Sequence, residues 1–188
     1  MAEMKPQSRP SMILRSSWGA VAAQNSGSCT RTNSPQYIIV HNSGDANDAL
    51  SKTFGSDERG FMKRLQEIHF GIGDCDLGYN YCIGLAGSLL EGADPTKEGR
   101  HTLGYNATSI GVCVHGNYNI RTLTSEQKNT LIYTLAWLCY KYNIHPTNIK
   151  GHGEVNSTDC PGADIKSKLS DIKTQVTYLL YPNEIPAN

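Results

Sequence analysis

The sequence has no excess of charge of either sign and no long hydrophobic run. Its 17 Lys and Arg residues balance 17 Asp and Glu residues, so the formal net charge is zero. A chain without a net charge has no overall field to draw it toward nucleic acid or an anionic membrane, which argues against both as partners. No apolar run approaches the roughly 18 residues needed to span a bilayer, so membrane insertion is not expected.

The N-terminal sequence MAEMKPQSRPSM also lacks the apolar stretch of a secretory signal, which predicts a cytoplasmic protein. Residues 1–12 are polar and contain two prolines, so they predict a disordered leader. Residues 13–181 contain no internal repeat and no break in composition, which indicates one compact domain. Residues 182–188 are aperiodic and predict a tail or the start of a linker to a wall-binding domain.

The six cysteines do not form the pattern of a disulfide-rich secreted protein. Cys82, Cys113 and Cys139 lie in apolar, periodic segments, where a free thiol behaves as a small buried hydrophobe. We therefore predict reduced thiols, as in a cytoplasmic protein. The sequence leaves room for one surface bridge that involves Cys29 or Cys75.

Segments with strand and helix patterns alternate along the chain. Apolar or β-branched runs predict strands at residues 37–41, 77–84, 88–93, 109–116 and 148–152. Apolar residues at helical spacing predict helices at residues 57–69, 124–142 and 162–180. This alternation predicts a single α/β domain with a central mixed sheet flanked by helices, in which the hairpin at 77–93 supplies the antiparallel pair.

The loop GHGEVNSTDCPG, residues 151–162, contains His152 and Cys160 eight positions apart. One interpretation is an ordinary turn with a His and a buried Cys. The other is a pair of zinc ligands whose third partner lies elsewhere in the chain. His41 ends the apolar run YIIVH, so it would meet His152 at one sheet edge if their two strands are neighbours.

Six motifs in order resemble the type-2 N-acetylmuramoyl-L-alanine amidases, a superfamily that includes phage amidase-type lysozymes and animal peptidoglycan recognition proteins. The motifs are WGA (18–20), VH (40–41), DLGYNY (76–81), GRHTLGYN (99–106), SIGVCVHGNY (109–118) and GHGEVNSTDCPG (151–162). The resemblance implies an amidase fold and a zinc enzyme that cuts the bond between N-acetylmuramic acid and L-alanine. It also implies that His41, His152 and Cys160 bind one zinc ion per chain.

The same resemblance assigns catalytic roles to Tyr79 and Thr158. Tyr79 matches a tyrosine beside the metal, whose hydroxyl could stabilise an oxyanion or orient water. Without the resemblance, a tyrosine in this strand pattern would be taken for a core residue. Thr158 stands where some relatives carry a lysine, so it offers one hydrogen bond without a charge.

The resemblance further implies that His101, Asn106 and Asn42 contact the substrate. His101 matches a histidine on the family's substrate groove, and Asn42 stands where many recognition proteins have a second histidine. Members of the family often have Gly-Trp where this chain has the segment Gly73–Cys75. One wall of the substrate groove, and with it the preference for stem peptides, is therefore expected to differ.

Together these observations predict a zinc-dependent peptidoglycan amidase, such as a phage endolysin or bacterial autolysin domain, that lyses cell walls after its release from the cytoplasm. Its partner would be the glycan-linked stem peptide. Two alternatives remain: a cytoplasmic muropeptide-recycling amidase, and an inactive peptidoglycan-binding module. The absence of paired carboxylates at strand ends argues against a glycosidase.

Overall fold

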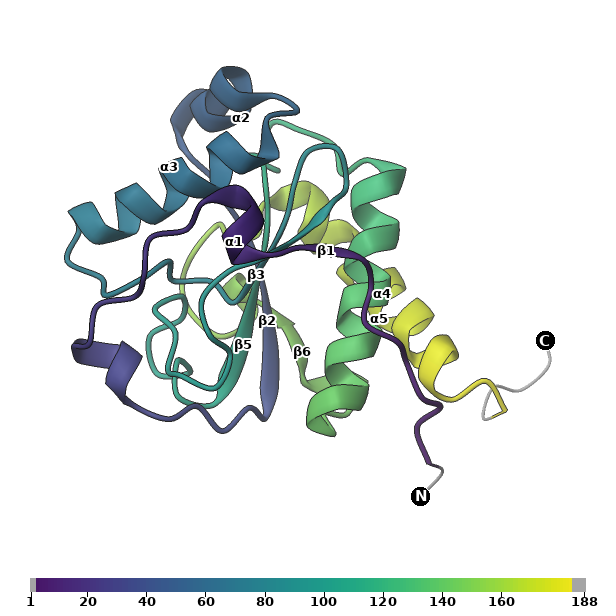
Figure 1. The fold of residues 1–188 in the computed structure, drawn as a ribbon. Coiled ribbons are helices and arrows are strands. Elements are labelled where there is room, and N and C mark those ends of the chain that lie inside the picture. Colours follow the sequence, from purple (N-terminus) through teal and green to yellow (C-terminus); the bar gives the residue numbers. More distant parts are fainter. Residues whose placement is uncertain (1–2, 184–188) are drawn as a thin grey trace.

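The computed structural model describes residues 3–183 as one six-stranded sheet with helices on both faces (Figure 1). The strands, in their order across the sheet, are β1 (Met12–Ile13), β4 (Leu89–Glu91), β3 (Tyr81–Ile83), β5 (Ser109–Val114), β2 (Tyr37–Asn42) and β6 (Ile149–Gly151). All neighbours are parallel except the β3–β4 hairpin. The predicted α/β fold with a mixed sheet is confirmed.

The helices α4 (Ser125–Tyr142) and α5 (Ala163–Leu180) cover one face of the sheet (Figure 1). The helix α4 begins with a capping box in which the Thr124 side chain accepts from the Gln127 backbone N–H. Residues at alternate positions of the strands, such as Val40 of β2, point into a core shared with these helices. Both helices lie where the sequence predicts them, within one residue at their N-terminal ends.

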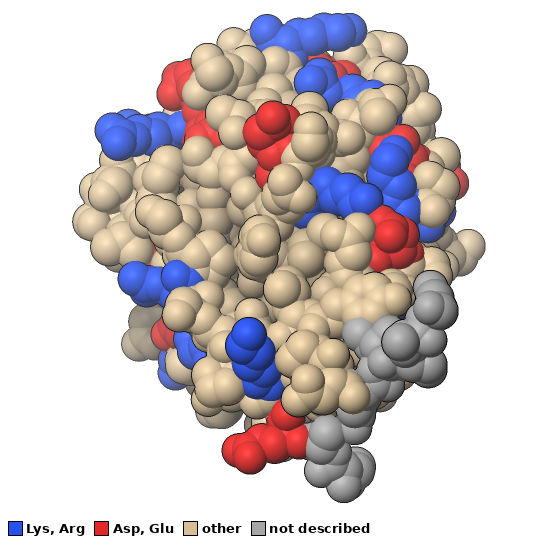
Figure 2. All heavy atoms as spheres, turned by 90° about the vertical axis from the view of Figure 1, so that its right-hand side faces the viewer, with Lys and Arg blue, Asp and Glu red and all other residues tan. Residues whose placement is uncertain are grey.

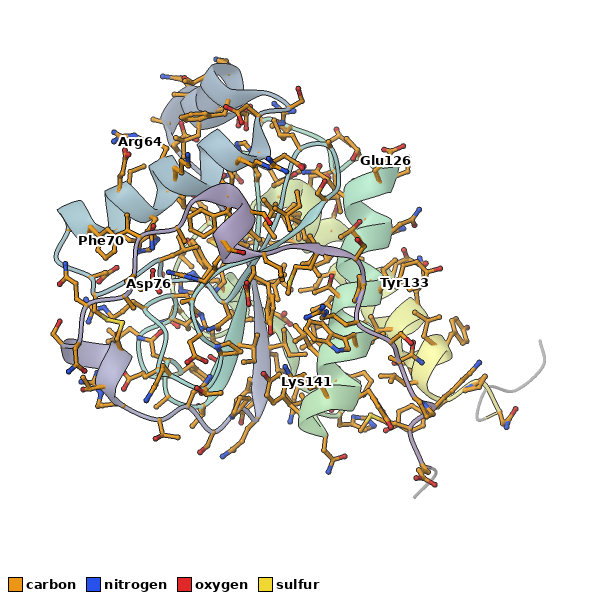
Figure 3. The ribbon with its side chains drawn as sticks, in the orientation of Figure 1. Arg64, Phe70, Asp76, Glu126, Tyr133 and Lys141 are labelled. Carbon is orange, nitrogen blue, oxygen red and sulfur yellow. A yellow bond between two sulfur atoms is a disulfide. The ribbon has the colours of Figure 1, made fainter. Side chains whose placement is uncertain are left out.

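The opposite face carries α1 (Arg15–Trp18), α2 (Ala49–Phe54) and α3 (Glu58–Gly71), of which only α3 is predicted. The helices α1 and α2 are too short to show a hydrophobic period. Figure 3 shows Phe70 on this side of the sheet and Tyr133 on α4 across it. His41 follows Val40 in β2, and alternation therefore directs its side chain toward the α3 face.

The N-terminal segment differs from the disordered leader that its composition predicts. The Lys5 backbone N–H donates to Leu180 O at 2.8 Å, and the Gln7 side chain donates to Leu179 O at 2.9 Å. Met4 and Met12 pack against the core beside α4 and α5. These hydrogen bonds and the two partly buried methionines hold residues 4–12 on the domain. Residues 1–2 of the leader and residues 184–188 of the tail lie outside the described part.

The prediction of six reduced thiols is wrong for one pair, because Cys29 and Cys75 form a disulfide. Cys29 lies in a short 3₁₀ turn and Cys75 in the loop after α3, so neither belongs to a periodic apolar segment. They are 46 positions apart in the sequence, and nothing in that stretch signals that they meet. The other four are free, and Cys82, Cys113 and Cys139 are buried as predicted.

The described surface carries charges of both signs. Figure 2 shows acidic and basic side chains intermixed on the side of the molecule where α4 and α5 lie. Within residues 3–183, no helix is long and apolar enough to span a membrane.

Candidate metal centre

Parallel pairing of β2 with β6 brings two histidines together. Val40 is in register with Gly151, so His41 and His152 follow at the same edge of the sheet. Their ring centroids are 4.6 Å apart. The two strands are therefore neighbours, as a shared site requires.

The loop that follows His152 folds back and places Cys160 against His41. The Gly153 backbone N–H donates to Cys160 O at 2.8 Å, which closes the loop at its base. The Cys160 Sγ lies 3.6 Å from His41 Nδ1 and 3.4 Å from the Asn42 backbone nitrogen, whose N–H points to the sulfur. The ligand atoms of His41, His152 and Cys160 all lie within 4.8 Å of one another.

This donor set fits a zinc ion. Two imidazoles and one thiolate are common zinc ligands, and three protein ligands with a free fourth position are typical of catalytic sites. Among residues 3–183, no further His, Cys, Asp or Glu belongs to the group. His41 is buried, whereas His152 and Cys160 are only partly buried, so the site has a solvent-facing side.

The protonation states of the ligands also suit a metal. Burial holds the pKa of His41 well below its ordinary value and lowers that of His152, so both imidazoles are neutral near pH 7. Burial raises the pKa of the Cys160 thiol to about 11, although the hydrogen bond from the Asn42 N–H and the charge of Lys166 each lower it. A thiolate at this position therefore needs a cation beside it.

The second nitrogen of His41 is held from behind by His101 and Thr102. His41 Nε2 lies 3.1 Å from His101 Nδ1 and 3.2 Å from Thr102 Oγ1. Such outer contacts fix the orientation of a metal-binding imidazole. His101 has 7% relative exposure and lies behind the candidate ligand His41, and its contact with the substrate stays a prediction. Sequence reasoning missed Thr102, whose only signal is its place after His101 in the GRHTLGYN motif.

Tyr79 lies beside the candidate metal ligands. It precedes β3, whereas Tyr81 lies within that strand and packs in the core against Trp137 of α4. Residues two positions apart in a strand share a face, but Tyr79 lies outside β3 and so does not share the face of Tyr81. The Tyr79 ring centroid is 5.1 Å from that of His41. Burial, with smaller effects from nearby thiols, raises the Tyr79 pKa well above its ordinary value, so the hydroxyl is a hydrogen-bond donor.

The remaining predicted site residues shape the loops around the site. Thr158 Oγ1 accepts from the Cys160 backbone N–H at 3.2 Å. Asn106 Oδ1 accepts from the backbone N–H groups of His101 at 2.9 Å and Thr102 at 2.7 Å. Asn42 is buried, and its backbone rather than its side chain faces Cys160. Substrate contact by Asn42 and Asn106 stays a prediction.

Comparison with known proteins gives one family and two kinds of relative. The model of the N-acetylmuramoyl-L-alanine amidase family matches residues 31–163. Peptidoglycan-recognition protein SC2 of Drosophila melanogaster is 31% identical over 160 residues, which are 84% of this chain and 84% of the relative. The human N-acetylmuramoyl-L-alanine amidase is 32% identical over 104 residues, which are 54% of this chain and 18% of that protein.

Solved structures with the same fold include both enzymes and recognition proteins. The amidase LysC from Clostridium intestinale superposes with a TM-score of 0.67 at 26% identity, over 89% of this chain and 98% of LysC. Drosophila PGRP-LB superposes with a TM-score of 0.73 at 25% identity, over 85% of this chain and 92% of PGRP-LB. A mutant of PGRP-LB in which phenylalanine replaces a tyrosine has been solved in complex with tracheal cytotoxin.

Proposed function

The chain belongs to the N-acetylmuramoyl-L-alanine amidase family, and from this premise we propose that it is a zinc-dependent hydrolase of peptidoglycan. Its substrate is the amide bond between N-acetylmuramic acid and L-alanine. The observation that carries the proposal is the convergence of His41, His152 and Cys160, whose ligand atoms lie within 4.8 Å of one another. Zinc bound there would polarise the amide carbonyl and activate water for attack.

Different residues around that centre would have different roles in the reaction. His101 and Thr102 hold His41 through its second nitrogen. The protonated Tyr79 hydroxyl would donate a hydrogen bond to the carbonyl oxygen of the scissile amide as negative charge develops there. Thr158 can add a second, uncharged donor, because its hydroxyl accepts from the Cys160 N–H and keeps its own hydrogen free to donate.

Two other functions compete with this proposal. An inactive peptidoglycan-binding module would need neither a complete ligand set nor a tyrosine beside it, and this chain has both. A muropeptide-recycling amidase would cleave soluble fragments in preference to intact walls. We propose that intact peptidoglycan is the substrate and that wall lysis is the outcome.

Turnover of purified sacculi tests the proposal. We expect about one zinc ion per chain by elemental analysis, release of soluble wall fragments, loss of turnover with a chelator, and recovery when zinc is restored. His152→Ala should lose both zinc and turnover. His145→Ala is the matched control, because His145 is exposed, precedes β6 where His152 follows it, and does not belong to the ligand group. Full activity in metal-free protein would contradict the zinc proposal, and activity on soluble muropeptides alone would favour recycling.

The disulfide bears on where the enzyme works. Disulfides persist in oxidising surroundings and are rare in the cytoplasm. We propose that the protein acts at the cell wall after leaving the cytoplasm, and that the Cys29–Cys75 bond forms after release. Alkylation of cytoplasmic and released protein, followed by intact-mass measurement, should show two more free thiols in the cytoplasmic form. Equal thiol counts would contradict this order of events.

A further inference from the structure

A buried carboxylate outside the ligand group connects two segments beside the candidate metal centre. Asp74 lies in the turn after α3, and its side chain is 3% exposed. Its Oδ2 lies 2.7 Å from His69 Nδ1, and its Oδ1 accepts from Arg100 Nε at 2.9 Å. We call Asp74, His69 and Arg100 the Asp74 clasp.

The clasp closes around Gly78, the residue before Tyr79. The Arg100 backbone N–H donates to Gly78 O at 3.1 Å. A Cβ added at Gly78 would lie 2.6 Å from both Arg100 O and His69 Cε1. Because any side chain at Gly78 would collide with both, only glycine lets the backbone pass this close to His69 and Arg100.

The clasp also bounds the ring of Tyr79. The Tyr79 ring contacts two imidazoles: its centroid is 5.1 Å from that of His41 and 5.5 Å from that of His69. The His69 ring meets it edge-on, at 85°. His69 therefore packs against the Tyr79 ring and restricts its movement, and the contact with Asp74 holds His69 in that position.

Closure of the turn after α3 does not require the Asp74 carboxylate. The Asp74 backbone N–H donates to His69 O at 3.0 Å, and the Ile72 N–H donates to Ile68 O and His69 O at 3.2 Å. These backbone bonds close the turn whatever the side chain at 74. The carboxylate instead makes its bonds to His69 and Arg100, the two residues that flank Gly78.

We propose that Asp74 is a positioning residue for the reaction, which keeps the Tyr79 ring at its place beside His41 and so directs its hydroxyl. The inference rests on the proposed amidase function. Without the carboxylate, the Arg100 side chain, which is 56% exposed, turns into solvent, and His69 loses its anchor. Tyr79 then samples positions that do not reach the scissile carbonyl.

The kinetic test compares Asp74→Ala with wild type on a soluble N-acetylmuramoyl peptide. Because outer partners of a site typically contribute about 10- to 100-fold, we expect kcat to fall by about tenfold or more with little change in KM or zinc content. Asp74→Asn should recover part of kcat, since its amide oxygen still accepts from Arg100. Asp171→Ala is the matched control, because Asp171 pairs with Lys128 on the α4 and α5 side and should leave kcat unchanged.

A double mutant isolates the route through Tyr79. If Asp74 acts by positioning the hydroxyl, Asp74→Ala should slow the Tyr79→Phe enzyme by less than twofold. An equal loss of kcat in both backgrounds would overturn the proposal.

A spectroscopic arm does not depend on turnover. In protein labelled with 3-fluorotyrosine, the fluorine signal that disappears in Tyr79→Phe belongs to Tyr79, and Asp74→Ala should shift or broaden it while Asp171→Ala leaves it unchanged. An unmoved signal would refute the role of Asp74 even in an active enzyme. If the wild-type protein lacks amidase activity but Asp74→Ala still moves the signal, the positioning of Tyr79 is upheld and the proposed function is rejected.

Discussion

The hydrogen bond behind His41 gives a sharp prediction about zinc affinity. His101→Leu removes the acceptor that lies 3.1 Å from His41 Nε2, whereas His101→Asn places an amide oxygen near the position of the lost Nδ1. Both variants lose the imidazole ring, which packs tightly: a Cβ added at Gly111 would lie 2.7 Å from it. The difference between the two variants therefore reports the hydrogen bond, with the loss of ring packing common to both.

The magnitude follows from the number of partners. Loss of an outer partner of a metal-binding histidine typically costs 10- to 100-fold in metal affinity, or about 1.4–2.7 kcal/mol. Thr102 Oγ1 remains 3.2 Å from His41 Nε2, so we expect His101→Leu to lie at the lower end, near tenfold. Zinc titration against a competing chelator measures the dissociation constant. Wild-type affinity in His101→Leu, or equal weakening in both variants, would refute the reasoning.

Three further predictions concern single groups. Tyr79→Phe should lower kcat by about 10²- to 10³-fold, the typical cost of one oxyanion donor, with little change in Tm; unchanged turnover would return Tyr79 to a packing role. Replacing Cys29 and Cys75 by serine should lower the free energy of unfolding by about 2–4 kcal/mol in denaturant titrations, because the bond closes a long loop; an unchanged midpoint would contradict this. Burial tends to raise the Asp48 pKa, but the Arg121 hydrogen bond and other donors lower it overall. The Asp48 carboxylate should therefore stabilise the fold above its unfolded pKa and lose that contribution as the solution is acidified. Asp48→Asn should lower the free energy of unfolding near pH 7, and its stability should converge with that of wild type in acid.

Elements with a strong hydrophobic period could be predicted from the sequence. The helix α4 begins after Thr124 as its N-cap indicates, and β2 ends in the His41–Asn42 pair. The strands β3 and β4 are shorter than predicted, and residues 77–80 of the run at 77–84 lie in the loop before β3. The two-residue strand β1 has no period to detect, and its pairing with β4 depends on a contact distant in sequence.

The candidate site also has parts that the sequence predicts and parts that it does not. The three candidate ligands could be named, because a His at a strand end and a His–Cys loop have a recognisable spacing and a family to match. The contacts behind them could not, since His101 meets His41 only through folding of the loop between β4 and β5. The Asp74 clasp likewise joins residues from the turn after α3 and from that loop. Contacts of this kind carry no periodic or motif signal.

End-group analysis of digested sacculi tests the central claim most directly. An amidase should expose new alanine α-amino groups in step with the loss of turbidity, without new reducing sugar ends, and chelation of zinc should stop the reaction. The described residues offer a His, His and Cys group and a tyrosine for attack on an amide, whereas glycoside cleavage requires two facing carboxyl groups. Reducing ends that rise while alanine amines stay constant would show a glycosidase and contradict the account.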